Sequence, residues 1–233
     1  MQNGIPVDSK IISSSSSSAT IDGLAAYTEY DINVKAFFNP TLFTSEELSI
    51  LTRSTSPLVT SREVTDSSIA LSWAASPGSV GYTLKITEAG ASSSPRIITT
   101  TENQISIVEQ IEPFTNYQVT ITAGFPAGHV DLSTQVDVKT DPAAPELTIS
   151  QVGTRDVQFS WSQVPGVEEY STKLSLQNGP LVDEYTVSAL TSTFQFNNLN
   201  VWSAYTITVT AKTASKSFTG SADFRTCKFL TAK

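Results

Sequence analysis

Cysteine, histidine and methionine are almost missing from this chain of 233 residues, which has one of each. A single cysteine excludes an internal disulfide and any zinc site built on paired cysteines. A single histidine excludes every metal centre that needs two or more histidines. Positive charge is also scarce, since 14 lysines and arginines face 22 aspartates and glutamates and give a net charge of −8. Because nucleic acids and anionic membranes are bound through basic surfaces, this balance argues against both as partners.

Charge of either sign and long apolar runs are sparse as well. Only 15% of the residues are charged, against about a quarter in typical globular proteins. No apolar run approaches the length of a membrane-spanning helix, about 18 residues. The first residues, Met1–Pro6, lack the basic and apolar regions of a secretory signal peptide. Either the protein is intracellular or the sequence is part of a longer chain, and the repeats described next favour the second.

The chain is rich in serine and threonine, with 33 and 31 residues, and it repeats itself. One repeated sequence pattern begins with an aliphatic residue, followed by an aromatic residue, then Thr or Ser, and then Tyr. After the tyrosine, apolar and polar residues alternate, and the pattern ends in Ala. Its copies occupy residues 24–36, 111–123 and 199–211. Their tyrosines, Tyr30, Tyr117 and Tyr205, are 87 (117 − 30) and 88 (205 − 117) residues apart. The spacing predicts structural units of slightly under 90 residues.

A second signature, W-x3-P-G-x3-Y, occurs twice. It joins Trp73 to Tyr82 and Trp161 to Tyr170, and the two tryptophans are again 88 residues apart (161 − 73). Each tryptophan precedes the tyrosine of the first signature by 44 residues (117 − 73 and 205 − 161). A tryptophan that matched Tyr30 would therefore fall before residue 1. The chain is predicted to hold two whole units and the back half of another.

The periodicity is that of β-strands. Ile69, Leu71 and Trp73 alternate with Ala70 and Ser72, and the stretches 157–161 and 117–123 repeat this alternation. A period of two with one apolar face is typical of a half-buried strand. Pro-Gly and Asn-Gly pairs separate the strands as turns. Short strands at regular spacing, in units near the size of an immunoglobulin-like domain, predict an all-β chain of tandem immunoglobulin-like β-sandwiches.

These residues resemble one known family, the fibronectin type III domains. The resemblance rests on the tryptophan, the Pro-Gly turn, the following tyrosine and the alternating line, which residues 111–123 match best. It departs from the family where Val201 and Ala26 replace the proline of that line. The resemblance implies structural roles in the sandwich core and in the tyrosine corner, a tyrosine whose hydroxyl bonds to the backbone just upstream. Core roles fall on Trp73, Tyr82, Trp161 and Tyr170, and corner roles on Tyr30, Tyr117 and Tyr205.

Four parts of the chain follow from the repeats. We expect a partial unit with the later strands only at 1–54, complete units at 55–140 and 141–227, and a tail at 228–233. The linkers are short and contain proline, which favours an extended array. Cys227 is expected to be a strand-end residue or to pair with a cysteine outside this sequence.

The partial unit lacks the tryptophan signature of the other two. Aligned on the tyrosines, Ile21 is level with Val108 and Phe196, and Ile11 and Ile12 are close to a strand position. We therefore expect strands on both sides of the serine tract, and apolar faces without their covering sheet. Such a half sandwich is expected to be disordered, or to be completed by self-association, by another chain or by a neighbouring unit. A truncated gene product is the simplest origin.

Catalytic chemistry is not indicated. His129 is expected at a hairpin tip of the middle unit, where it is most simply an exposed loop residue, and Phe125, His129 and Asp131 form a candidate contact loop for a partner. The sequence has no calcium-loop, phosphate-loop or dinucleotide motif. It also has no Arg-Gly-Asp tripeptide and no acceptor site for N-linked glycans. We expect no catalytic residues, no cofactor and no metal.

Three functions remain open, because a fold alone does not decide between them. The first is a spacer and protein-binding segment of a cell-surface or secreted protein, with a partner still unknown and membrane attachment only through segments outside this sequence. The second is an intracellular scaffold array. The third is an accessory module of a secreted bacterial enzyme, for which an exposed tryptophan platform would be the sign.

Overall fold

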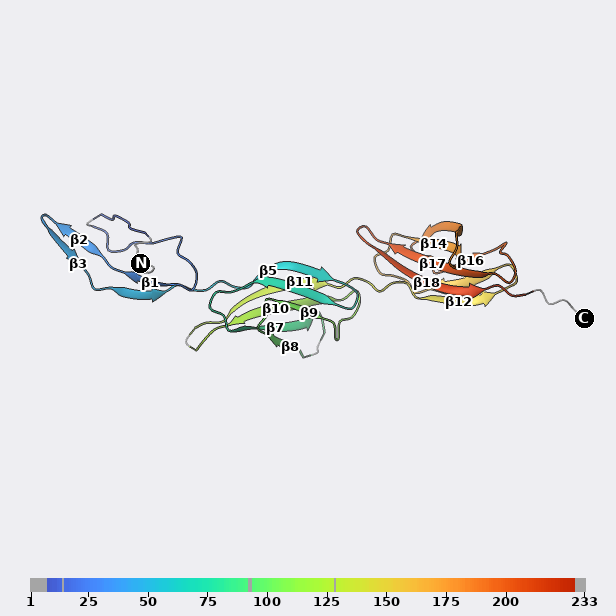
Figure 1. Cartoon of the computed structure of the whole chain (residues 1–233), viewed down its shortest axis with the longest axis horizontal. Coiled ribbons are helices and arrows are strands. Elements are labelled where there is room, and N and C mark those ends of the chain that lie inside the picture. Colours follow the sequence, from blue (N-terminus) through green and yellow to red (C-terminus); the bar gives the residue numbers. More distant parts are fainter. Residues whose placement is uncertain (1–7, 14, 92–93, 128, 229–233) are drawn as a thin grey trace, which may run out of the picture. The chain divides into compact units, whose positions relative to one another are not determined.

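The computed structural model describes residues 8–13, 15–91, 94–127 and 129–228. Within these residues it contains eighteen β-strands and no helix (Figure 1). No helix in this part of the chain is therefore long and apolar enough to cross a membrane. The predicted all-β fold is confirmed.

Two sheets make up the middle unit. One has three strands in the order β5-β6-β9, namely β5 (Leu58–Val64), β6 (Ile69–Ala74) and β9 (Gln104–Ile107). The other has four strands in the order β11-β10-β7-β8, namely β11 (Leu132–Lys139), β10 (Asn116–Gly124), β7 (Gly81–Glu88) and β8 (Arg96–Thr100).

The C-terminal unit repeats this order. Its three-stranded sheet is β12-β13-β16, namely β12 (Leu147–Val152), β13 (Val157–Trp161) and β16 (Thr193–Phe196). Its four-stranded sheet is β15-β14-β17-β18, namely β15 (Leu181–Ser188), β14 (Glu169–Leu176), β17 (Ala204–Lys212) and β18 (Ser217–Arg225). All five strand pairs of this unit are antiparallel. Each unit is thus a sandwich of three strands against four.

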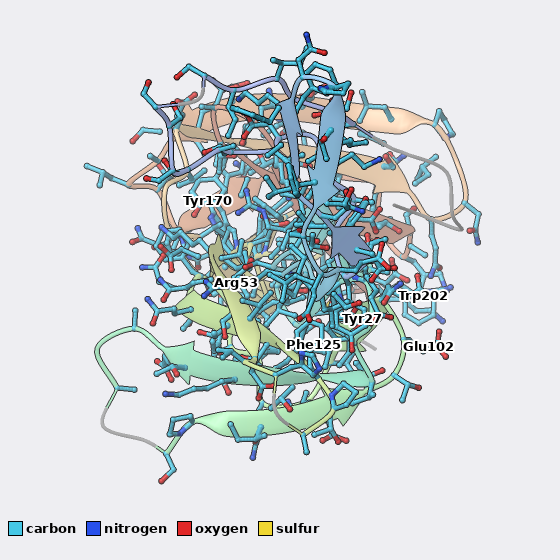
Figure 2. All side chains as sticks on the ribbon, turned by 90° about the vertical axis from the view of Figure 1, so that its left-hand side faces the viewer. Tyr27, Arg53, Glu102, Phe125, Tyr170 and Trp202 are labelled. Atoms are coloured by element: carbon cyan, nitrogen blue, oxygen red, sulfur yellow. The ribbon has the colours of Figure 1, made fainter. Side chains whose placement is uncertain are left out.

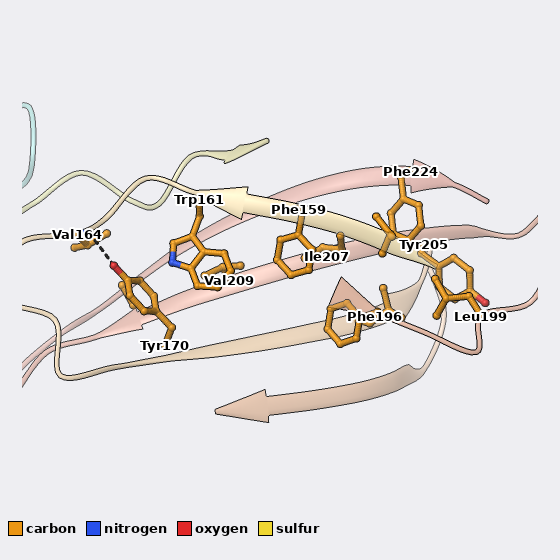
Figure 3. Packing of buried hydrophobic residues seen from close by; sticks show 13 residues of the cluster. Phe159, Trp161, Val164, Tyr170, Phe196, Leu199, Tyr205, Ile207, Val209 and Phe224 are labelled. Carbon is orange, nitrogen blue, oxygen red and sulfur yellow. Dashed lines mark hydrogen bonds between the residues drawn. The ribbon is translucent and has the colours of Figure 1, made fainter. Parts of the chain in front are cut away.

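The core of each sandwich comes from the alternation seen in the sequence. In β13, Val157, Phe159 and Trp161 are at most 5% exposed, whereas the residues between them are not buried. In β17 the facing set is Tyr205, Ile207, Val209 and Ala211, each at most 1% exposed. Figure 3 shows these side chains meeting between the two sheets. Burial of this continuous apolar layer is the main driving force for the fold.

The N-terminal segment, residues 8–52, has four short strands. β1 (Glu29–Ile32) pairs with β4 (Leu48–Leu51), and β2 (Lys35–Phe38) forms a hairpin with β3 (Thr41–Thr44). Residues 17–28 and the described residues before them form no strand. Our expectation of strands at Ile11, Ile12 and Ile21 is therefore wrong.

The reason for this error is the lack of a pairing partner. In the middle unit, Ile11 and Ile12 are level with β8, which pairs with β7, and Ile21 is level with Val108, directly after β9, which pairs with β6. The N-terminal segment contains no counterpart of β6 or β7. A sequence with strand propensity does not form a strand unless a neighbour accepts its backbone hydrogen bonds.

Strand pairing keeps residues 58–139 and residues 147–225 in separate sheets. The boundaries at 54, 140 and 227 stay predictions, and most of the tail lies outside the described residues.

Candidate functional site

A buried pair of aromatic rings accounts for one repeated signature. The rings of Trp73 and Tyr82 meet edge to face at 5.3 Å, and those of Trp161 and Tyr170 do so at 5.4 Å. All four side chains are at most 5% exposed. Such contacts add about 0.5–1.5 kcal/mol to the stabilisation from burial.

The tyrosine of each pair also fixes the turn between its two strands. The Tyr170 hydroxyl accepts a hydrogen bond from the Val164 amide at 2.8 Å, drawn in Figure 3, and the Tyr82 hydroxyl accepts one from the Ser76 amide at 3.0 Å. In both units the donor follows the tryptophan by three residues and directly precedes Pro-Gly. The glycine that follows, Gly166 in the C-terminal unit, has a φ of 75°, which disfavours other residues. The pattern W-x3-P-G-x3-Y therefore places a tryptophan at the end of one strand, Pro-Gly in the turn, and a tyrosine in the next strand where its hydroxyl can accept a hydrogen bond from the turn.

The tyrosine corner occurs at the start of β17 and again in the N-terminal segment. The Tyr205 hydroxyl accepts the Asn200 amide at 3.0 Å, and the Tyr30 hydroxyl accepts the Ala25 amide at 2.9 Å. In both cases the donor lies five residues upstream. Tyr117 occupies the same position in β10 and is 4% exposed. The corner holds the loop that leads into the strand.

A threonine at the end of each last strand closes the same loop, a role that was not predicted from the sequence. The Thr140 hydroxyl donates to the Glu112 carbonyl at 2.7 Å and accepts the Thr115 amide at 2.7 Å. Thr226 and Thr52 make the equivalent pair of bonds in the other two parts. We call this arrangement the threonine clasp. The signal in the sequence is a threonine 21 to 23 residues after each corner tyrosine (52 − 30, 140 − 117, 226 − 205).

These features decide the type of fold. Both complete units place three strands against four, pack a tryptophan between the sheets, and carry the repeated sequence patterns in register. Each complete unit has the fibronectin type III fold. The N-terminal segment keeps the corner and the clasp of a third such unit.

The chain is similar in part to several known proteins. No protein-family model matches the chain. Over 165 residues, 69% of its length, the chain is 30% identical to receptor-type tyrosine-protein phosphatase eta of Mus musculus, and it spans 13% of that protein. Among solved structures, it is similar to a two-domain fibronectin type III segment of chicken tenascin (TM-score 0.41, 14% identity, 74% of this chain and 99% of that one). It is also similar to the FN1–FN3 domains of chicken CNTN1 (TM-score 0.35, 19% identity, 88% of this chain and 80% of that one).

The candidate contact loop connects β10 and β11 of the middle fibronectin type III domain. At its base, the Phe125 amide donates to the Asp131 carboxylate at 3.2 Å, so Asp131 holds the loop together. Phe125 is half-buried and His129 is exposed. The most exposed apolar side chain here is Val130, at 81%, which was not among the predicted contact residues. The loop can therefore offer a contact surface. Among the described residues no three His, Cys, Asp or Glu side chains gather in a way that could hold a metal ion.

Trp202 is the exposed tryptophan of the C-terminal domain, at 51%, and it is labelled in Figure 2. Its ring lies 4.0 Å from the Lys228 ammonium and 5.2 Å from the Arg225 guanidinium. The equivalent Phe114 of the middle domain lies 3.6 Å from the Lys139 ammonium. These aromatic rings contact cations of their own domain. Trp202 thus has an exposed ring with two cationic side chains close to it.

Two ion pairs cross the four-stranded sheet of the C-terminal domain. Lys173 lies 3.1 Å from Glu184, and Lys212 lies 2.8 Å from Glu169. The hydrogen bond from Lys173 lowers the pKa of Glu184 below its usual value of 4.5, with help from the Ser171 hydroxyl. The hydrogen bond to Glu169 raises the pKa of Lys212 above 10.5. These two acidic residues thus belong to cross-strand ion pairs.

Cys227 follows the last strand of the C-terminal domain and is exposed. Its amide donates to the Gly153 carbonyl at 2.9 Å, and its sulfur lies 3.4 Å from the Val152 carbonyl oxygen. The residue thus ties the end of the domain to its first strand. Pairing with a cysteine outside this sequence stays a prediction.

Proposed function

We propose that this chain is a non-catalytic segment of a cell-surface or secreted protein, where it acts as a spacer and as a protein-binding module. The observation that carries the proposal is the succession of two fibronectin type III domains, each with its own sheets and core. The mouse relative that matches over 69% of the chain is a receptor-type protein, which supports a place in an ectodomain.

A spacer needs domains that stay folded when the chain is pulled. In each domain the first and the last strands are tied into the structure, and the threonine clasp holds the end of the last strand to the corner loop. The linker at 141–145 contains two prolines, which limit bending between the domains. These features suit a stiff array better than a flexible tether.

The protein-binding part of the proposal rests on the loop with Phe125, His129 and Asp131. Loops placed by a rigid scaffold commonly carry binding residues. In this loop Asp131 fixes the base while His129 and Val130 are exposed. An adhesion assay on the immobilised full chain tests this role. We expect cells to attach to it, and attachment to fall when Val130→Asp and His129→Ala are combined. A matched change at Ser215→Ala, in the corresponding loop of the C-terminal domain, should leave attachment unchanged.

The location is tested on cells that make the parent protein. An antibody against residues 55–227 should label intact cells, or detect the protein in the medium. Labelling only after the membrane is permeabilised would instead support an intracellular scaffold. Linkage to a bacterial catalytic domain in the full-length product would support the accessory-module alternative.

A further inference from the structure

The hairpin of β2 and β3 in the N-terminal segment has an apolar tip. Its sequence from Ala36 to Ser45, Ala-Phe-Phe-Asn-Pro-Thr-Leu-Phe-Thr-Ser, contains no charged residue. Four of its large apolar side chains are between 55% and 77% exposed: Phe37, Phe38, Leu42 and Phe43. Large exposed apolar patches on proteins mark interaction sites. We call residues 35–44 the apolar hairpin.

The same hairpin occurs in the complete C-terminal domain, and its tip is open there too. Phe37 lies opposite Leu42 in the apolar hairpin, and Lys212 lies opposite Ser217 in the hairpin of β17 and β18. These positions are 175 residues apart (212 − 37 and 217 − 42). The Lys212 side chain is 44% exposed and Ser217 is exposed, although this sandwich has all seven strands. A complete sandwich therefore leaves these hairpin positions in contact with solvent.

The two hairpins share a backbone register and differ in the chemistry of their tips. The C-terminal hairpin has a polar or cationic residue at each of the four positions: Lys212, Thr213, Lys216 and Ser217. At the same positions the apolar hairpin has three large apolar residues and one threonine: Phe37, Phe38, Thr41 and Leu42. The hairpin geometry therefore does not require apolar side chains at the tip, and their presence calls for a contact outside the domain.

The apolar side chains lie on both faces of the hairpin. Opposite residues share a face and successive residues alternate between faces. Phe37 and Leu42 therefore lie on one face, whereas Phe38 and Phe43 lie on the other. A groove on a folded partner protein would cover one of these faces and leave the other in water. An apolar medium that surrounds the tip covers both.

The polarity of the hairpin changes from its base to its tip. Lys35 lies at the base, and Glu46 and Glu47 follow directly after it. From the pair Lys35–Thr44 to the tip, the hairpin extends over three residues, or about 10 Å. Elements that bind at a bilayer surface bury their apolar side chains to about this depth, 5–10 Å. Because the hairpin has only two strands, the outer edges of its backbone still need water, which confines it to this interfacial layer.

We propose that the apolar hairpin inserts its tip into the surface of a lipid bilayer. Phe37, Phe38 and Leu42 would enter the layer between the headgroups and the acyl chains, while Lys35 stays among the phosphates. The net charge of −8 favours a bilayer of zwitterionic lipids over an anionic one. Membrane attachment was predicted only through segments outside this sequence, and this contact would lie within it. The inference goes beyond the proposed protein-binding role and does not depend on the β10–β11 loop.

The test mixes the full chain with phosphatidylcholine vesicles and measures the fraction that floats with them in a density gradient. We expect reversible binding with an association constant on the order of 10⁴ M⁻¹, as for a single lipid anchor. Phe37→Ser combined with Leu42→Ser should weaken binding by at least about 10-fold, because two apolar side chains no longer leave water. A separate variant, Phe38→Trp, reports the position of the tip. Its fluorescence should be quenched by vesicles with brominated acyl chains more strongly than that of the wild type.

A matched control removes apolar side chains of similar exposure elsewhere. Leu181→Ser combined with Val182→Ser changes two residues of the edge strand β15 that are 53% and 48% exposed, and vesicle binding should stay unchanged. Equal binding by the wild type and the Phe37→Ser, Leu42→Ser variant overturns the proposal. Binding that needs anionic lipid and disappears in salt also overturns it, because charge would then hold the chain on the bilayer. A dimer in solution that the same double variant abolishes would overturn it in favour of a protein contact.

Discussion

The N-terminal segment and the C-terminal domain share the later half of the repeat, which contains the corner and the clasp, and they differ in the earlier half. Both have a corner tyrosine whose hydroxyl accepts an amide five residues upstream, and both have the threonine clasp. Only the C-terminal domain has strands in front of this half, and only there are the inward positions of the corner strand fully buried. The corner is therefore a local structure that forms over about 30 residues, whereas the core needs strands brought together from the whole domain.

The comparison also separates two kinds of stabilising interaction. The hydrogen bonds of the corner replace bonds to water and contribute about 1 kcal/mol each. The core removes apolar side chains from water and supplies most of the free energy of folding. A part of the chain with a corner and no core should therefore have the right local geometry and little stability.

The largest expected difference is in hydrogen exchange. In the free chain, amides of β17 should be protected at least about 1,000-fold more than amides of β1, because core strands open only with global unfolding, at roughly 5–15 kcal/mol. Exchange read by mass spectrometry on the intact chain measures both regions in one sample. Equal protection in a monomer would show that the N-terminal segment folds alone, and would remove the contrast between corner and core.

Removing a core tryptophan should make a complete domain resemble the N-terminal segment. We expect Trp73→Ala to destabilise the middle domain by about 3–5 kcal/mol, since a buried ring is replaced by a cavity. The effect is measured by denaturant unfolding, with hydrogen exchange of the β10 amides as the readout. Trp202→Ala is the matched control, because this ring is 51% exposed. It should change the free energy of unfolding of the C-terminal domain by less than about 1 kcal/mol. A loss below 1 kcal/mol for Trp73→Ala would contradict a core role.

The sequence predicted the parts of the fold that repeat with a fixed spacing. Alternation in residues 69–73 and 157–161 predicted strands with one buried face, and the structure shows them. The two signatures, in register at 88 residues, predicted two complete sandwiches and a partial one. These features are readable because each depends on residues close together in the chain.

The features that were not predicted depend on residues far apart in the chain. The strand expected at Ile21 is absent because strand formation needs a neighbour, and propensity alone does not supply one. The threonine clasp joins residues 25 and 52, and each of its threonines is one of 31 in the chain. The pairing of Lys173 with Glu184 depends on the register between β14 and β15. This register contains an irregularity directly after Leu174.

The clasp should stabilise a complete domain more than the N-terminal segment. Thr140→Val keeps the shape but leaves the Glu112 carbonyl and the Thr115 amide without the hydroxyl, in a site where Thr140 is 2% exposed. We expect a loss of about 1–3 kcal/mol in the middle domain. Thr52→Val is the matched change, and water can reach its half-buried site. The effects of both variants are measured as denaturant midpoints, and amide hydrogen exchange shows which region is destabilised. Equal effects would mean that burial does not decide the strength of the clasp.

The smallest expected effect is a difference between the two complete domains in how much stability they lose at acidic pH. Lys173 and Glu184 lie opposite each other on β14 and β15, and the positions 88 residues earlier hold Lys85 and Arg96, which have no carboxylate to titrate. The pKa of Glu184 is lowered in the folded state, so the pair contributes stability above the usual carboxylate value near 4.5. That contribution is lost as the pH falls through the lowered pKa. Because both side chains are more than 40% exposed, the change should be slight. Denaturant midpoints of the two domains, followed from pH 7 to pH 3, should show an extra decrease in the C-terminal domain, and Glu184→Gln should remove this extra decrease. The same acid response in the wild type and in the Glu184→Gln variant would show that this ion pair does not stabilise the sheet.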